Sequence, residues 1–277
     1  MDPRNDDEVR AHYDRVLRRE AAPDEPGATV ERVGAVVRQV SGRGGWSGVL
    51  WSGLDSGPAA DAAIAEQLCY YGALGLSFEW KQHAHDRPAD LGERLTAAGF
   101  LAGPPETVMV AEVAAVERTP AWPEGVTVRR VADPAGLAPV LDVHRRVFGG
   151  DQEPLRRRLA AQLTEAPERV RVLLVLAGEL PVCAARLELT PDAGFGGLWG
   201  GGTLPEWRGR GIYRALVAHR AALAAEAGCR LLHVDASAES RPVLERLGFT
   251  PITVTTPYLS PAPATATPAP GAAAHGG

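Results

Sequence analysis

The sequence predicts an α+β fold: a mixed, mostly antiparallel sheet flanked by helices and arranged as two tandem units. In the C-terminal region, strand and helix patterns follow the order β-α-α-β-β-β-α-β-α-β, with one crossover helix. The N-terminal region echoes the second half of this order. Both regions also close a short helix with Gly-Phe, in ERLTAAGF ending at Phe100 and VLERLGF ending at Phe249. We therefore expect two related folds, the first of them abbreviated.

The boundary between the two units is predicted in the segment TPAWPEG, which has two prolines and a glycine between regions that each begin with β-branched runs. This divides the chain into an N-terminal domain at 1–118, a linker at 119–125 and a C-terminal domain at 126–258. Residues 259–277 alternate Pro with Ala, Thr and Gly and offer no large apolar side chain to a core, so a disordered tail is expected there.

The N-terminal region begins with an amphipathic helix over Asp6 to Glu20, whose apolar face includes Val9, Tyr13 and Leu17. The segment AAPDEPGA then ends this helix. The elements expected after it are strands at 35–40 and 48–54, a helix at 59–75, a strand at 76–83, a helix at 90–98 and a strand at 107–113.

The C-terminal region begins with a strand at 126–131 and a helix that Asp133 caps and Pro134 opens. The apolar face of that helix is predicted to comprise Leu137, Val140, Leu141 and Phe148. The elements expected next are a helix at 153–163, strands at 170–177, 182–189 and 197–204, a helix ending at Gly228, a strand at 231–234, a helix at 241–247 and a strand at 252–255.

Composition excludes several classes of protein. The 277 residues are 45% hydrophobic and 23% charged, as in an ordinary globular protein, and no apolar stretch is long enough to span a membrane. The N-terminus has no apolar signal core, so a cytoplasmic location is expected. The net charge of −5 argues against nucleic acid as a partner, and the oligomeric state cannot be inferred. The cysteines at 69, 183 and 229 have no CxxC spacing and predict neither disulfides nor a zinc site.

The segment Gly200 to Tyr213, GGGTLPEWRGRGIY, carries the clearest chemical signal. A strand ends near Pro205, and the chain passes through Arg-Gly-Arg-Gly into the first turn of a helix, where about four backbone N–H groups lack intrahelical partners. Glycines allow close approach by a ligand, and the helix dipole together with Arg208 and Arg210 favours an anion. This predicts a pyrophosphate site; the alternative is a tight turn with solvated arginines.

Residues from about Val126 to Tyr258 resemble the GNAT N-acyltransferase superfamily, whose loop pattern is Gln/Arg-x-x-Gly-x-Gly/Ala. Arg208-x-x-Gly211 satisfies the first part, whereas Tyr213 replaces the usual Gly or Ala. The resemblance implies that acetyl-CoA is the co-substrate. It also implies that the strand before the loop offers main-chain groups to pantetheine. The cofactor-binding residues expected on this basis are Gly202, Thr203, Leu204, Arg208, Gly209, Arg210, Gly211, Ile212, Tyr213 and Ser237.

The segment ASAESRPVLERLGF resembles the family pattern Asn-x-x-Ala-x-x-x-Tyr-x-x-x-Gly-Phe. Here Ser237 stands for the Asn, Ser240 for the Ala and Leu244 for the Tyr. The tyrosine that usually protonates the leaving thiolate is therefore missing. Ser240 or Tyr258 could hydrogen-bond the sulfur instead; otherwise these residues are a helix cap and a residue at the edge of the core.

An amine acceptor is protonated at neutral pH, so the reaction needs a base or a water chain. The candidates are Glu188 and Asp235, at strand ends that face the expected cleft. The alternative is that each is a solvated or turn-capping carboxylate. With Ser240, they form the predicted catalytic set.

Other polar and aromatic residues allow two interpretations. His83-x-His85 with Asp86 lacks further metal ligands, so no metal is expected. Trp46, Trp51 and Trp80 are either core residues or the lining of an acceptor pocket. The run Arg156 to Arg158 is either a solvated helix face or the border of the acceptor site.

The N-terminal region resembles a degenerate GNAT half. Its equivalent of the pyrophosphate loop reads DSGPA, with neither Arg nor a Gly-x-Gly turn, so it is expected to bind no CoA and to shape the acceptor cleft. The function predicted for the chain is acetyl transfer from acetyl-CoA to a primary amine on a small molecule or a protein. The alternative is a non-catalytic acyl-CoA-binding or regulatory module.

Overall fold

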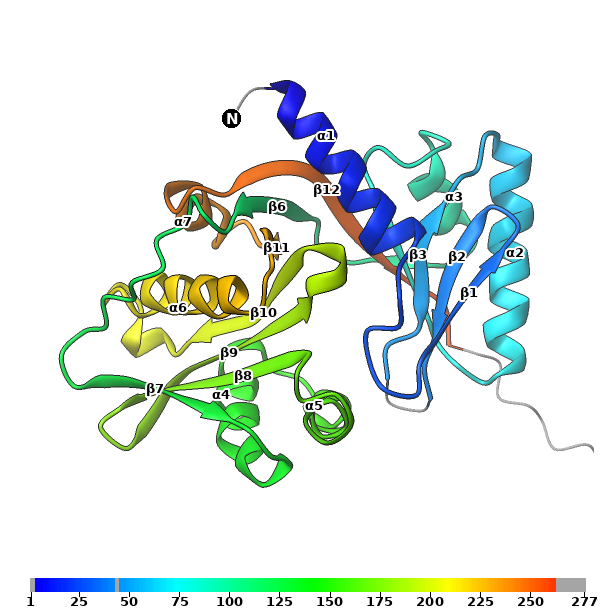
Figure 1. Cartoon of the computed structure of the whole chain (residues 1–277). Coiled ribbons are helices and arrows are strands. Elements are labelled where there is room, and N and C mark those ends of the chain that lie inside the picture. The colour runs from blue at the N-terminus through cyan, green and yellow to red at the C-terminus, as the bar shows by residue number, and fades with distance from the viewer. Residues whose placement is uncertain (1–2, 43–44, 263–277) are drawn as a thin grey trace, which may run out of the picture.

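The computed structural model describes residues 3–42 and 45–262, and these ranges form one continuous 12-stranded sheet with helices on its faces (Figure 1). The strand order is β1-β2-β3-β4-β12-β6-β11-β10-β9-β8-β7, and β5 pairs with β12. Neighbouring strands are antiparallel except for two parallel pairs, β3–β4 and β10–β11. The predicted α+β class with a mostly antiparallel sheet is confirmed. The predicted tail at 263–277 lies outside the described residues.

The N-terminal half places α2 and α3 against one face of its strands. Its elements are α1 (Pro3–Tyr13), η1 (Asp14–Arg19), β1 (Thr29–Val33), β2 (Val36–Val40), β3 (Gly48–Ser52), α2 (Gly57–Ala73), β4 (Glu79–His83), α3 (Leu91–Ala97), β5 (Leu101–Ala102) and β6 (Glu106–Glu112). Strand β1 was not predicted, because TVERV carries charges within the strand and none of its residues is fully buried. An edge strand of this kind has only a weak hydrophobic pattern.

The C-terminal half carries the elements expected for the second unit. They are β7 (Val126–Val131), η2 (Pro134–Leu137), α4 (Ala138–Phe148), α5 (Glu153–Glu165), β8 (Val170–Ala177), β9 (Leu180–Thr190), η3 (Pro191–Ala193), β10 (Phe195–Thr203), η4 (Pro205–Trp207), α6 (Ile212–Glu226), β11 (Leu231–Ala236), α7 (Arg241–Arg246) and β12 (Thr250–Leu259). Asp133 caps the turn before α4, since its side chain accepts a hydrogen bond from the Gly136 N–H. Phe148 was expected on the buried face, and this is wrong: it is 58% exposed.

The two halves exchange strands, which no local sequence pattern predicts. Strand β6 belongs to the N-terminal half but lies between β11 and β12 of the C-terminal half. Strand β12 in turn pairs with β6 through residues 250–255 and with β4 through residues 255–259. Figure 1 shows β12 crossing from α7 to the side of α2. Each half therefore completes the sheet of the other, and the predicted strand at 252–255 is longer than expected because it serves both.

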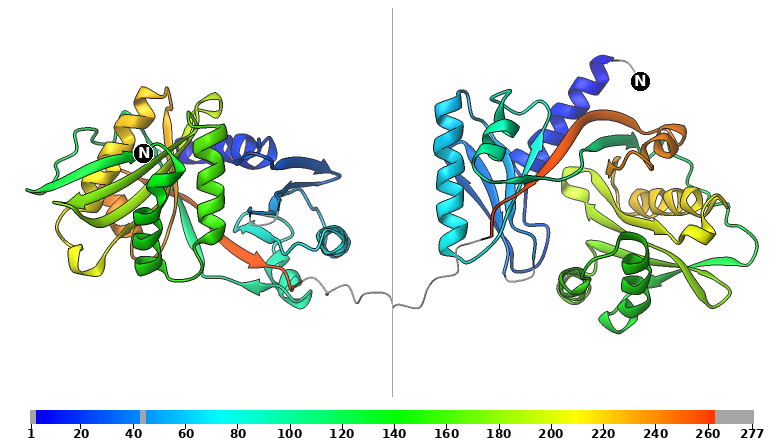
Figure 2. Two further views of the ribbon diagram at one scale, coloured as in Figure 1. Left: turned by 90° about the horizontal axis from the view of Figure 1, so that it is seen from below. Right: turned by 180° about the vertical axis from the view of Figure 1, so that it is seen from behind.

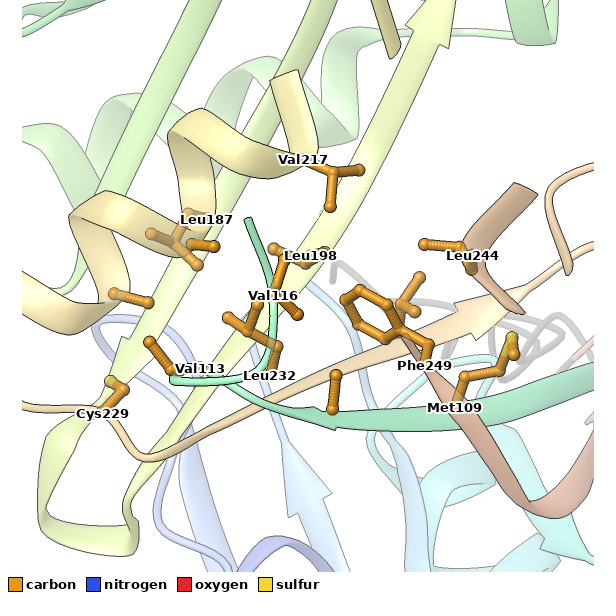
Figure 3. Packing of buried hydrophobic residues seen from close by; sticks show 14 of the residues in the cluster. Met109, Val113, Val116, Leu187, Leu198, Val217, Cys229, Leu232, Leu244 and Phe249 are labelled. Atoms are coloured by element: carbon orange, nitrogen blue, oxygen red, sulfur yellow. The ribbon is translucent and has the colours of Figure 1, made fainter. Parts of the chain in front are cut away.

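The largest core cluster joins the halves in the same way (Figure 3). Met109 on β6 and Val113 and Val116 after it pack among side chains of the C-terminal half. Those partners include Leu187, Leu198, Val217, Leu232, Leu244 and Phe249. Because these residues are at most 7% exposed, separating β6 from the C-terminal half would open this core.

The predicted first helix is present as α1 and continues as the π-helical turn η1. It spans the two halves on one side of the sheet, as the view from behind also shows (Figure 2). Tyr13 packs edge-on against Phe195 and His233 of the C-terminal half, while Arg18 donates to the Leu50 carbonyl of the N-terminal half. Among the described residues, no helix is both long and apolar enough to cross a bilayer.

Candidate active site

The predicted anion loop lies between β10 and α6. A 3₁₀ turn, η4, follows β10, and the chain then enters α6 through Arg208 to Gly211. Gly209 has φ +75° and Gly211, at the N-cap, has φ +86°. Side chains other than Gly, Asn and Asp seldom adopt such angles. The two glycines thus allow the tight turn through which the chain enters α6.

The backbone amides of this loop are free. The N–H groups of Trp207 and Arg208 close the 3₁₀ turn, and the N–H of Ala215 is the first to bond back, to the Gly211 carbonyl. Within the described chain, the six N–H groups from Gly209 to Arg214 have no protein acceptor, and no side chain caps the helix. A row of free amides at a helix N-terminus is the arrangement that binds phosphate groups.

The strands beside the loop separate. β10 and β11 pair in parallel only from Phe195 with Leu231 to Gly197 with His233, although both strands continue beyond these residues. An extra residue bulges β10 between Trp199 and Gly202. Past Gly197, the inner edges of both strands therefore face an opening instead of each other, and an extended ligand can reach their main-chain groups there.

The glycine run of β10 lies between α4 and α6, and this explains why no side chain stands there. A Cβ at Gly200 would lie 2.6 Å from His144 Cε1, and one at Gly202 would lie 2.8 Å from Phe148 Cε2, both on α4. On the other face, a Cβ at Gly201 would lie 3.1 Å from Tyr213 Cε2 on α6. Tyr213, which departs from the loop pattern, therefore packs against the bulge of β10 on the α6 side of the sheet.

The other residues predicted to bind the cofactor differ in how far their polar groups are already engaged with the protein. Arg208 donates from Nε to the Thr203 carbonyl, and Arg210 lies over the Trp207 ring at 4.5 Å. Leu204 was expected to offer main-chain groups, and this is wrong for its N–H, which donates to the Val182 carbonyl at 2.9 Å. Its side chain is buried in the core. Gly202 and Thr203 lie at the end of β10, opposite Ala184 and Cys183 of β9, and their part in binding pantetheine stays a prediction.

Ser237 and Ser240 follow the carboxyl end of β11, across the opening from the loop. Their hydroxyl groups hydrogen-bond each other at 3.2 Å, and Ser240 immediately precedes α7. Neither residue lines the cavity described below. The structure thus separates Ser240 from the two carboxylates with which it was grouped. Ser240 occupies the N-cap position of α7, but its side chain makes no capping hydrogen bond and instead donates to the Ser237 carbonyl. Leu244, where the family pattern has Tyr, is fully buried.

A cavity of about 650 Å³ lies where the two halves meet, on the face of the sheet that also carries α5. Its lining includes Trp199 and His233, which flank the point where β10 and β11 diverge. It also includes Glu188 and Asp235, so both predicted bases face the same space. A volume of this size holds a small organic molecule.

Glu188 is neither solvated nor a turn cap. Its carboxylate accepts from Arg186 Nε at 2.8 Å and from Arg158 Nη2 at 3.2 Å. Burial by itself would raise the pKa of Glu188, but the two guanidinium groups lower it below its ordinary value. A carboxylate held ionised in this way accepts a proton poorly. Glu188 therefore fits a positioning role on the cavity wall.

Asp235 is buried, at 2% side-chain exposure, and its Oδ2 forms an ion pair with the Lys81 ammonium group from the N-terminal half. Its Oδ1 has no hydrogen-bond partner in the described structure. Burial would lower the pKa of Lys81, but Asp235 beside it raises the value above the ordinary one. Asp235 thus lines the cavity with one buried carboxylate oxygen that no protein donor satisfies.

The polar side chains that the N-terminal half contributes to this cavity were not among the predicted site residues. Glu79, Lys81 and His83 alternate along β4 and all line the cavity, together with Glu106 on β6. Burial and the nearby Asp235 raise the pKa of Glu106. The alternation in EWKQH is a usable signal for one polar face, but the strand exchange that brings this face to Asp235 is not visible in the sequence.

The structure distinguishes between the two interpretations given above for the tryptophans and for the arginine run. Trp46 lines the cavity, whereas Trp80 is buried in the N-terminal core. Arg158 also lines the cavity, where it binds Asp24 and Glu188, whereas Arg156 and Arg157 are exposed and pair with Glu153.

The histidine motif is part of an ion-pair network. Asp86 binds Arg18, and His85 pairs with Asp14. Within the described ranges, no three His, Cys, Asp or Glu side chains are grouped as metal ligands would be. At the loop equivalent in the N-terminal half, the Ser56 hydroxyl caps the Ala59 N–H, so this helix start differs from that of α6.

Two buried histidines make the stability of the fold depend on pH. Burial, and for His144 also Arg186, lowers the pKa of both His144 and His233 to about 4. Below about pH 6.5 the unfolded chain binds protons that the folded chain does not, so stability falls as the pH decreases toward 4. We expect a loss of up to roughly 3 kcal/mol for each histidine, measured by urea unfolding. His144→Gln should reduce the loss between pH 6.5 and 4, and an unchanged pH dependence would contradict this assignment.

Comparisons with known proteins agree with this geometry. Residues 138–249 match the model of the Acetyltransferase (GNAT) family. No curated protein matches the chain. Among solved structures, a GCN5-related N-acetyltransferase from Kribbella flavida has a TM-score of 0.65 and 18% identity, over 85% of this chain and 90% of that one.

A second solved structure, a GCN5-related N-acetyltransferase from Sphaerobacter thermophilus, has a TM-score of 0.57 and 17% identity over 92% of this chain and 84% of that one. A tandem GNAT protein from the clavulanic acid biosynthesis pathway has a TM-score of 0.57 and 14% identity, over 88% of this chain and 85% of that one. At these identities the likeness concerns the fold. Taken with the family match, it identifies a GNAT acetyltransferase domain at residues 138–249.

Proposed function

We propose that this protein transfers an acetyl group from acetyl-CoA to a primary amine by direct attack in a ternary complex. The observation that carries the proposal is the row of six free amides from Gly209 to Arg214 beside the opening between β10 and β11. The amides suit the diphosphate, the inner strand edges suit the amide groups of pantetheine, and the cavity at the point of divergence suits the acceptor.

In this arrangement the Asp235 carboxylate, which lines the cavity, removes one proton from the acceptor ammonium group. The neutral nitrogen then attacks the thioester carbonyl, a C–N bond forms and the C–S bond breaks. The second nitrogen proton is transferred to the departing thiolate, so the products are an amide, free CoA and one proton. Holding the two reactants side by side supplies much of the rate enhancement without a covalent enzyme intermediate.

The test combines calorimetry with acetyl-CoA and a panel of amines assayed by thiol release. We expect binding of acetyl-CoA, and turnover that Asp235→Asn lowers by about 10²-fold or more while acetyl-CoA affinity stays unchanged. Urea unfolding checks that this variant folds, since Lys81 loses its counter-charge. Binding with no turnover on any amine would favour the non-catalytic acyl-CoA-binding module. Absence of binding would refute both functions.

Phe148 provides a second check on where acyl-CoA lies. It is 58% exposed and lies beside Gly202 at the opening, where pantetheine would cover it. Phe148→Ala should weaken acetyl-CoA binding by about 1–2 kcal/mol, roughly 5- to 30-fold, and leave the stability of the fold unchanged. The matched control is Leu180→Ala, which removes another exposed apolar side chain, at the first residue of β9. Equal affinities for both variants would place the ligand elsewhere.

A further inference from the structure

The cavity wall contributed by the exchanged strands has an excess of negative charge. Glu79 on β4, Glu106 on β6 and Asp235 on β11 all line it, and they are close enough for Glu79 and Asp235 both to raise the pKa of Glu106. The one cationic side chain among them is Lys81, which pairs with Asp235. This wall therefore carries three carboxylates and one ammonium group, and the ammonium group pairs with Asp235 alone.

Two of these carboxylates have no cationic partner in the described part of the chain. Glu79 accepts one hydrogen bond, from the Trp46 indole N–H at 3.2 Å, and no ion pair involves Glu106. Asp235 is 2% exposed, and its Oδ1 lacks any donor. Buried polar atoms nearly always have a partner in native proteins, so an unsatisfied oxygen on a carboxylate that lines a cavity indicates a ligand with donor groups.

The other cationic and titratable groups that line the cavity in the described structure are neutral or already paired; Arg15 binds Glu20 and Arg169 binds Glu168. Burial lowers the pKa of His83 well below its ordinary value and that of His233 to about 4, so both imidazoles are neutral near pH 7. The arginines on the opposite wall, Arg158 and Arg186, already bind Glu188. Arg18 is held by Asp14 and Asp86.

We propose that the acceptor is a small molecule with at least two ammonium groups, one acetylated beside Asp235 and the other bound by Glu79 and Glu106. This inference rests on the proposed function. Lys81 Nζ lies 5.4 Å from the Trp199 ring centre, so the Lys81–Asp235 pair marks the end of the cavity next to the opening between β10 and β11. Glu79 is two residues away on β4, about 7 Å along the strand, so the two nitrogens are several bonds apart.

The test uses three acceptors that share one reacting amine. 1,5-Diaminopentane carries a second cation, pentylamine carries none, and 5-aminopentanoate carries an anion instead. In the wild-type protein we expect kcat/KM to be at least 30-fold higher for the diamine than for pentylamine, and lowest for the amino acid. Glu79→Gln with Glu106→Gln should reduce the preference for the diamine to less than 5-fold, while kcat/KM for pentylamine and acetyl-CoA affinity remain the same.

The matched control is Asp192→Asn, which removes an exposed carboxylate from the rim of the same cavity and should leave the preference unchanged. Calorimetry of 1,5-diaminopentane with the wild type and the double variant gives a readout that does not need turnover. Diamine binding that the double variant loses, with no acetylation of any amine, would refute the proposed function and support the cation site. Acetylation without preference for the diamine, or a preference that survives the double substitution, would overturn the inference and leave the proposed function standing.

Discussion

Replacement of Gly211 by aspartate should weaken acetyl-CoA binding at least a hundredfold and change the stability of the fold by no more than about 1 kcal/mol. Gly211 is the N-cap of α6 at φ +86°, and a Cβ there would meet nothing closer than Arg214 Nη2 at 3.7 Å. Asp tolerates this backbone angle better than most residues, and an Asp side chain at an N-cap stabilises a helix. The same negative charge would face the diphosphate across the free amides, which we expect to cost roughly 3 kcal/mol or more, about a hundredfold in Kd.

Gly211→Asn is the matched control, because it has the same shape and the same tolerance of the backbone angle without the charge. Calorimetry with acetyl-CoA should show a loss of at most about tenfold for Asn and of at least a hundredfold for Asp. Urea unfolding should place both variants within about 1 kcal/mol of the wild type. Equal affinities for the Asp and Asn variants would mean that no anion is bound at this helix start.

The loop could be predicted because its chemistry is local. A strand end, two glycines and a helix start within Pro205 to Tyr213 determine which amides stay free, and all of this is visible in consecutive residues. The same holds for the cap at Asp133. The exposure of Phe148 could not be predicted from helical spacing, since the residue ends α4 beside the opening of the sheet.

The cavity could be predicted only in part, because it depends on contacts far apart in the chain. Glu188 and Asp235 were found as acids at strand ends, but their partners Arg158 and Lys81 were not assigned to them. Lys81 reaches Asp235 because β12 carries the N-terminal sheet across to the C-terminal one. Nothing in the local pattern of β12 distinguishes a strand that serves two halves from an ordinary final strand.

The ion pair of Arg18 with Asp86 should contribute the largest single polar effect on stability. Both side chains are 3% exposed, and Arg18 Nη2 donates to both carboxylate oxygens, at 2.8 and 2.7 Å. Burial would lower the pKa of Arg18, but Asp86 and Asp14 raise it. Asp86→Asn keeps the shape and leaves a buried guanidinium group with one carboxylate instead of two. We expect the free energy of unfolding to fall by about 3 kcal/mol, measured in urea.

The control is Asp7→Asn on α1, which breaks an exposed pair with Arg10 and should change stability by less than about 0.5 kcal/mol. In a double-mutant cycle, Arg18→Met should lower the free energy of unfolding much less in the Asp86→Asn background than in the wild type. In that background the substitution leaves no Asp86 carboxylate without its cationic partner. Additive effects would show that the two groups are not coupled. Since Arg18 joins η1 to β3 and also lines the cavity, strong coupling would mean that the N-terminal helix is held as one wall of the acceptor site by this pair.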